Sequence, residues 1–150
     1  MFTLDAIMSS DLVTLAPSGT LAEARELMQE HRIHHIPVVA EGSDLIGLVT
    51  LTNVLAATDS VLRKTDNRIH ASDIRIEDVM VTEVATVDRN ASLRQAALFL
   101  EKHRIGCLPV IDDGKLCGII TETDFVAVAI NLLEQIEDSE PDDDDFLATG

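Results

Sequence analysis

The chain of 150 residues is 46% hydrophobic and carries a formal net charge of −16 at pH 7. That length can build one compact core or two small halves that share a core. The charge argues against nucleic acid and anionic membrane surfaces as partners, because both would repel the chain. No stretch is long and apolar enough to span a membrane, and the first ten residues lack the features of a signal peptide, so we expect a cytoplasmic protein.

The first half of the chain predicts a short strand followed by an amphipathic helix. Leu12–Leu15 is typical of a strand, and a Pro-Ser-Gly stretch ends it. Thr20 and Glu23 have the spacing of a capping box. The helix that follows has apolar residues at helical spacing, and those expected to face inward are Leu21, Ala24, Leu27 and Met28. We expect it to end near His31, because the residue before Pro37 is biased to extended backbone.

Two further strands and a second helix complete this unit. Ile36–Val39 indicates a buried strand. Polar residues over 41–44 predict a turn, and Leu45–Thr50 predicts a strand that leads directly into a helix near Asn53. The unit is therefore strand, helix, strand, strand, helix.

The same unit occurs a second time. The segment HRIHHIPVV at 31–39 matches HRIGCLPVI at 103–111, an offset of 72 residues that becomes 71 after the following turn. At these offsets Met8 matches Met80. Such a period indicates two copies of one supersecondary unit, each unable to bury its apolar face without the other.

The doubled pattern resembles a tandem pair of CBS (cystathionine β-synthase) domains over residues 7–131. The resemblance is carried by Met8 and Met80, by the IPVV and LPVI strands, and by the GLVTLTN and GIITETD strand ends. It implies an α/β fold in which two β-α-β-β-α repeats pack about a pseudo-twofold axis and leave two clefts. The expected parts are a first repeat over 1–57, a linker over 58–78, a second repeat with an extended C-terminal helix over 79–137, and an acidic disordered tail over 138–150.

A candidate ribose site lies where the last predicted strand meets the last predicted helix. Thr121 and Asp124 place a hydroxyl and a carboxylate beside helix N-terminal N–H groups. A carboxylate can accept hydrogen bonds from both vicinal hydroxyls of a ribose, although Thr and Asp at a helix start are also common caps. The resemblance implies that both residues bind ribose, and it adds Thr14, from the Thr-bearing strand, to the candidate ligand-binding residues.

The first copy departs from this pattern, because Thr50 and Asn53 stand at the matching positions. Asparagine lacks the charge and has one acceptor oxygen, so capture of two hydroxyls is weakened. We therefore expect two unequal clefts.

A second asymmetry concerns the start of the IPVV strand, where His34 and His35 are replaced by a Gly-Cys pair in the second copy. The resemblance implies that residues at this point face a cleft and often touch phosphate. His34 and His35 would then face the phosphates of a ligand whose ribose sits on Asp124. An alternative is that both histidines are ordinary, partly exposed residues at a strand start.

The sequence as a whole predicts a non-catalytic regulatory sensor. The expected ligand is an adenosine compound, namely AMP, ADP, ATP or S-adenosylmethionine, and no cofactor is required. No catalytic motif is recognisable. We expect a homodimer through an apolar row at Leu132, Leu133 and Ile136, and a regulated protein partner is possible.

Two alternatives stay open. The chain could be an interaction or structural module with empty clefts. Less favoured is a metal-binding protein, because His31, His34 and His35 lie close in sequence but Pro37 argues against a single helix through them. The cysteines, Cys107 and Cys117, lack metal-type spacing and suit a reducing compartment as small apolar side chains.

Overall fold

The computed structural model of the protein describes residues 3–63 and 70–139. Residues 60–63 are described only as part of a helix. The helices and strands are α1 (Leu4–Ile7), α2 (Leu21–His31), β1 (His35–Val39), β2 (Leu45–Thr50), α3 (Leu51–Arg63), β3 (Val87–Asp88), α4 (Leu93–His103), β4 (Cys107–Asp112), β5 (Lys115–Thr121) and α5 (Glu122–Ser139). Short 3₁₀ turns are η1 (Glu41–Ser43), η2 (Ala71–Asp73) and η3 (Ile76–Asp78).

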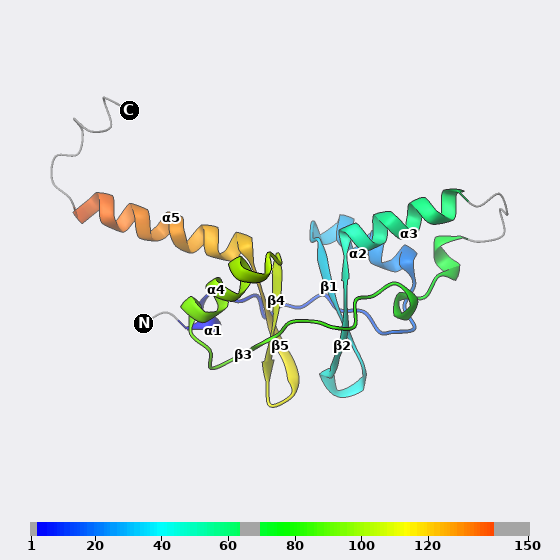
Figure 1. The fold of residues 1–150 in the computed structure, drawn as a ribbon, viewed down its shortest axis with the longest axis horizontal. Coiled ribbons are helices and arrows are strands. Elements are labelled where there is room, and N and C mark those ends of the chain that lie inside the picture. The colour runs from blue at the N-terminus through cyan, green and yellow to red at the C-terminus, as the bar shows by residue number, and fades with distance from the viewer. Residues whose placement is uncertain (1–2, 64–69, 140–150) are drawn as a thin grey trace, which may run out of the picture.

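Two similar halves lie side by side, with their strands in the middle and their helices toward the outside (Figure 1). In the first half, β1 and β2 form an antiparallel pair. In the second half, β4 and β5 are antiparallel and β3 runs parallel to β4. The predicted α/β fold of two related repeats is confirmed.

The helix boundaries follow from local signals in the sequence. The hydroxyl of Thr20 accepts a hydrogen bond from the Glu23 N–H at 3.2 Å, and α2 ends at His31 as predicted. The full capping box, with both reciprocal hydrogen bonds, occurs at Ser92 at the start of α4. Each helix is followed by a C-cap arginine in the left-handed region, Arg32 and Arg104, with φ of 55° and 51°.

The predicted strand at Leu12–Leu15 is wrong in extent, because only Leu15 forms a bridge, parallel to Val38 of β1. The residues before it belong to a segment that crosses to the other half. Ser9 exchanges two backbone hydrogen bonds with Ile119 of β5, at 2.9 and 3.0 Å. The chain from Ser9 to Leu15 therefore connects the two halves and leaves little length for a strand in the first.

Each half has its own hydrophobic core, and each core contains a side chain from outside its own repeat. The core of the first half includes Ile76, which is fully buried and lies just before the second repeat. The core of the second half includes Leu4, also fully buried, from the N-terminus. The two halves thus exchange short segments, so neither core is complete within one continuous repeat.

Met8 and Met80, the repeated methionines, each pack against a strand of the opposite half. A Cβ at Gly118 of β5 would lie 3.0 Å from Cγ of Met8, and a Cβ at Gly47 of β2 would lie 2.9 Å from Cγ of Met80. A Cβ at either position would force the methionine side chain to shift, so glycine leaves the room in which each methionine packs against the strand.

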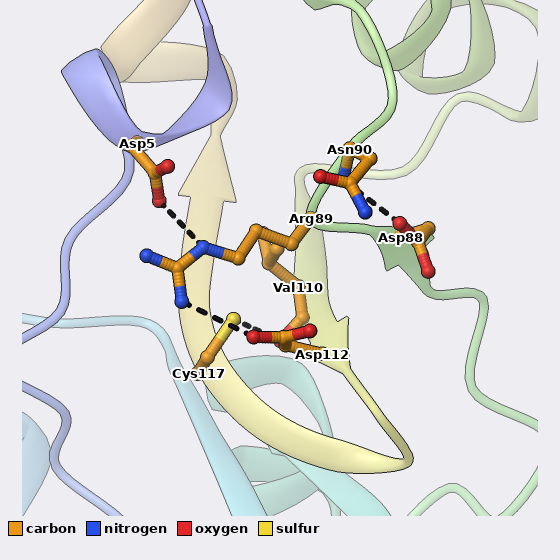
Figure 2. A network of polar contacts seen from close by, with 7 residues as sticks. All are labelled: Asp5, Asp88, Arg89, Asn90, Val110, Asp112 and Cys117. Atoms are coloured by element: carbon orange, nitrogen blue, oxygen red, sulfur yellow. Dashed lines mark hydrogen bonds and ion pairs between the residues drawn. The ribbon is translucent and has the colours of Figure 1, made fainter.

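A polar network also holds α1 against the second half (Figure 2). The Arg89 guanidinium contacts Asp5 of α1 through Nε at 3.0 Å and Asp112 of β4 through Nη1 at 3.3 Å. All three side chains are largely exposed, so water screens these pairs. Burial of Leu4 is therefore the main attachment of α1.

Helix α5 extends away from the second half and buries none of its residues (Figure 1). It runs to Ser139, two residues beyond the predicted end of the repeat, and the rest of the predicted acidic tail lies outside the described residues. Within 3–63 and 70–139, no helix is both long and apolar enough to cross a membrane.

Candidate functional site

A cavity of about 430 Å³ lies between the two halves, within the size range typical of small-molecule sites. The crossing segment, the turn between α2 and β1, and the junction of β5 with α5 all contribute to its wall. Its polar and charged lining residues, together with the glycine beside them, are Ser9, Asp11, Arg32, His34, His35, Gly106, Thr121, Glu122, Thr123 and Asp124. Four of the predicted site residues, His34, His35, Thr121 and Asp124, are therefore brought together.

Thr121 and Asp124 form the cap of α5. One carboxylate oxygen of Asp124, Oδ2, accepts hydrogen bonds from the Thr121 N–H at 2.8 Å and from the Thr121 hydroxyl at 3.3 Å. Among the described residues nothing donates to the other oxygen, Oδ1. The capping role is therefore compatible with a ligand role, because a ribose hydroxyl can donate to Oδ1.

The matching pair in the first half is different. The Asn53 side-chain oxygen accepts from the Thr50 hydroxyl at 2.7 Å and from the Thr50 N–H at 3.2 Å. The Thr50 hydroxyl in turn accepts from the Asn53 N–H at 3.1 Å. Because an amide has one acceptor oxygen, this cap leaves Asn53 no second oxygen to offer a ribose.

His35 reaches from β1 across to the second half. Its imidazole lies against Gly106, since a Cβ at that glycine would be 3.5 Å from Cε1 and 3.6 Å from Nε2. Burial lowers the pKa of His35 below its ordinary value of 6.5, and the neighbouring His34 lowers it further, while Glu122 opposes both. His35 is therefore neutral at pH 7 and provides no fixed positive charge.

Cys107 occupies in the second half the position that His35 has in the first. The thiol is buried, and burial together with the nearby Asp124 raises its pKa to about 12. Cys117 donates a weak hydrogen bond to the Val110 carbonyl at 3.4 Å (Figure 2). Neither cysteine is disulfide-bonded, and a thiol with so high a pKa as that of Cys107 is a poor nucleophile.

Several lining residues were not predicted from the sequence. Arg32 follows α2 as Arg104 follows α4, so the sequence gives no reason to single it out. It reaches the cavity only because the two halves pack together. No sequence motif distinguishes Asp11 and Glu122 from the other acidic residues of the chain. Thr14, which was predicted, is not among the lining residues, although Val13 is, so its role stays a prediction.

The predicted histidine cluster does not form a metal site in the described part of the chain. No group of three or more His, Cys, Asp or Glu side chains there is arranged to hold an ion. His31 ends α2 and His35 starts β1, so the two do not share one helical face.

Comparison with known proteins agrees with this fold. A model of the CBS domain family matches residues 4–60 and 76–131. The CBS domain-containing protein YhcV of Bacillus subtilis is 31% identical over 125 residues, which are 83% of this chain and 84% of YhcV. Homoserine O-acetyltransferase of Methanocorpusculum labreanum is 32% identical over 121 residues, but this match spans 79% of the chain and 22% of that protein.

Solved structures are similar over almost the whole described chain. AcuB of Vibrio cholerae has a TM-score of 0.78 with 38% identity, over 94% of this chain and 99% of that one. CBSX2 of Arabidopsis thaliana, solved in complex with AMP, has a TM-score of 0.74 with 28% identity, over 88% and 98% of the two chains. The CBS domain pair of MJ0100, solved with 5′-methylthioadenosine and S-adenosylmethionine, has a TM-score of 0.72 with 25% identity, over 85% and 98%.

The family model covers both halves of the fold, and YhcV matches over most of its own length. The repeat found in the sequence corresponds to the two matched segments. The chain belongs to the CBS domain family and carries two CBS repeats in tandem.

Proposed function

We propose that this protein is a regulatory sensor that binds one adenosine-containing ligand in the cavity beside Asp124 and catalyses no reaction itself. The observation that carries the proposal is the free Oδ1 of Asp124, which belongs to a helix cap that lines a cavity of about 430 Å³. The complexes of CBSX2 with AMP and of the MJ0100 pair with S-adenosylmethionine support the choice of ligand class.

The roles of the lining residues follow from their chemistry. Asp124 accepts from the ribose hydroxyls, and Thr121 holds the carboxylate in place through its two hydrogen bonds. His34 and His35 belong to the other half, so they meet the opposite side of a ligand that fills the cavity. Thr50 and Asn53 are the corresponding pair of the first half, where we propose the weaker of two clefts.

Regulation then acts through the relative packing of the halves. The cavity wall combines the first half at His35, the second half at Asp124 and the crossing segment at Ser9. A ligand that touches all three changes the balance between two arrangements only by the difference in its affinity for them. A partner protein or a second copy of the chain would recognise the altered arrangement of the two halves.

We also propose that the protein is a homodimer through α5. This helix presents large exposed apolar side chains, and its Leu133 and Ile136 are 57% and 51% exposed. Light scattering should give a dimer mass at moderate salt and a weaker dimer at low salt, because acidic chains repel more when screening is reduced. Leu133→Glu and Ile136→Glu should give monomers, and a monomer mass for the wild type at both salt concentrations would contradict the dimer.

Calorimetric titration tests the ligand directly. AMP, ADP, ATP and S-adenosylmethionine are each titrated into the wild-type protein under one buffer condition. The proposal expects at least one of them to bind with one site per chain. If none binds, the sensor proposal fails and the chain is better described as an interaction module.

A further inference from the structure

The lining of the cavity holds more carboxylates than permanent positive charges. Asp11, Glu122 and Asp124 contribute three carboxylates, and Arg32 contributes the permanent positive charge. Among the described residues, the ion pairs involve other side chains and leave these four without a charged partner. A ligand that enters the cavity therefore meets more negative than positive charge.

Three other features could favour an anion, and none reverses this balance. His34 also lines the cavity, and even a full positive charge on it would give two cations against three carboxylates. His35 lines the cavity, but its burial keeps it neutral at pH 7. The N-terminus of α5 also faces the cavity and carries a partial positive charge of about half a unit. Glu122 and Asp124 both lie in the first turn of that helix, so their own charges outweigh it.

The carboxylates that line the cavity come from two separate segments of the chain. Asp11 comes from the crossing segment, and Glu122 and Asp124 come from α5. We place the 5′ substituent of a ribose bound at Asp124 in the same cavity, which Asp11 and Glu122 also line. Charge at that substituent is thus felt at short range, where screening by salt is incomplete.

We propose that, among adenosine ligands, this cavity selects those with a positively charged 5′ substituent, such as the sulfonium of S-adenosylmethionine, over 5′-phosphates. The proposal rests on the proposed function and specifies its ligand class. Asp11 and Glu122 are the residues that determine this selectivity. S-adenosylmethionine carries a sulfonium and an ammonium against one carboxylate, whereas a phosphate monoester carries about −1.5 to −2 at neutral pH.

The order of affinities tests the proposal. Calorimetry at pH 7 compares S-adenosylmethionine, 5′-methylthioadenosine, AMP and ATP. The expected order is the sulfonium first, the neutral thioether second and the phosphates last, with S-adenosylmethionine about tenfold or more tighter than AMP. Raising the salt concentration should weaken binding of S-adenosylmethionine and strengthen binding of AMP, because it screens attraction in one case and repulsion in the other.

Two substitutions separate the specific carboxylates from the general charge of the chain. Asp11→Asn and Glu122→Gln should each reduce the preference for S-adenosylmethionine over AMP by about two- to tenfold, the range expected for removal of one partly solvated charge. Glu101→Gln is the matched control, because Glu101 is exposed on α4 and lies outside the cavity lining. Melting temperatures of all variants check that each is folded.

The possible failures are distinguishable. If AMP binds as tightly as S-adenosylmethionine or more tightly, and Asp124→Ala abolishes that binding, the charge selectivity is wrong while the adenosine site stands. If the sulfonium ligand is preferred but neither Asp11→Asn nor Glu122→Gln changes the ratio, the assignment of the two residues is wrong. If no adenosine ligand binds, the proposed function itself is wrong.

Discussion

The imidazole of His35 packs against Gly106, which stands in the second half where His34 stands in the first. A Cβ at Gly106 would be 3.5 Å from Cε1 of His35, an ordinary van der Waals contact. A larger side chain at position 106 would compete with the ring for the same space. The exchange of a His-His pair for a Gly-Cys pair between two otherwise similar strands is therefore complementary, because the glycine accommodates the ring from the opposite half.

This contact predicts a steric threshold at position 106. Gly106→Ala should change the free energy of unfolding by less than about 0.5 kcal/mol, because its Cβ finds an ordinary contact distance. Gly106→Leu should destabilise by about 1–3 kcal/mol, since it must displace the ring of His35. Urea denaturation of the two variants measures the difference. Equal stabilities would show that the ring does not depend on the space at Gly106.

A second prediction concerns acid stability. Because the pKa of His35 is lower in the folded chain than its ordinary value of 6.5, the unfolded chain takes up the proton first as the pH falls. Stability associated with His35 is thus present above pH 6.5 and is lost as the pH falls through 6.5 toward the folded pKa. His35→Gln should therefore show a smaller drop in melting temperature than the wild type between about pH 8 and pH 5.5.

His31→Gln provides the control for this titration, because His31 is exposed at the end of α2. Its pH profile should follow that of the wild type. If the His35→Gln profile is as steep as the wild-type profile, the buried neutral imidazole does not limit acid stability.

The segment exchange predicts that residues at the N-terminal end of each matched repeat stabilise the opposite half. Leu4→Ala and Ile76→Ala should each destabilise by about 2–5 kcal/mol, as expected when a fully buried aliphatic side chain is truncated. Leu55→Ala should cost less than about 0.5 kcal/mol, because Leu55 is 59% exposed. Hydrogen exchange should then show the loss of protection for Leu4→Ala first in β4 and β5. Protection lost first in β1 and β2 would contradict the exchange.

The same exchange predicts the behaviour of an isolated repeat. A fragment of residues 1–65 contains the first repeat but lacks Ile76 and Met80, which pack in its core or on its strand β2. It also leaves Leu4 without the core that buries it. We expect no cooperative thermal transition by circular dichroism, and a sharp transition would show that the repeat folds without the exchanged segment.

Local signals explain how much of the fold could be predicted. Pro37 indicated that the chain is extended by Ile36, so α2 had to end before that point, and the caps at Thr20 and Ser92 follow from short spacings. These features depend on residues that are close together in the chain, so they can be recognised directly in the sequence. The repeat itself indicated that both halves share one order of strands and helices.

Contacts between distant segments could not be predicted in the same way. Leu4 and Ile76 each begin one matched repeat and pack in the core of the other, and no local pattern in the sequence indicates this. The cavity charges of Asp11, Arg32 and Glu122 depend on how the two halves pack. The ribose pair at Thr121 and Asp124 was predicted because the family resemblance supplied what the local sequence, which fits an ordinary cap equally well, does not.

The central claim is that one adenosine ligand binds per chain, on the carboxylate of Asp124 and not on the amide of Asn53. The most direct measurement is calorimetric titration of S-adenosylmethionine and AMP into the wild type, Asp124→Ala and Asn53→Ala, with melting temperatures to confirm that each variant is folded. We expect one site per chain in the wild type, loss of binding in Asp124→Ala and little change in Asn53→Ala. Wild-type binding by both variants, or loss of binding in Asn53→Ala alone, would contradict it.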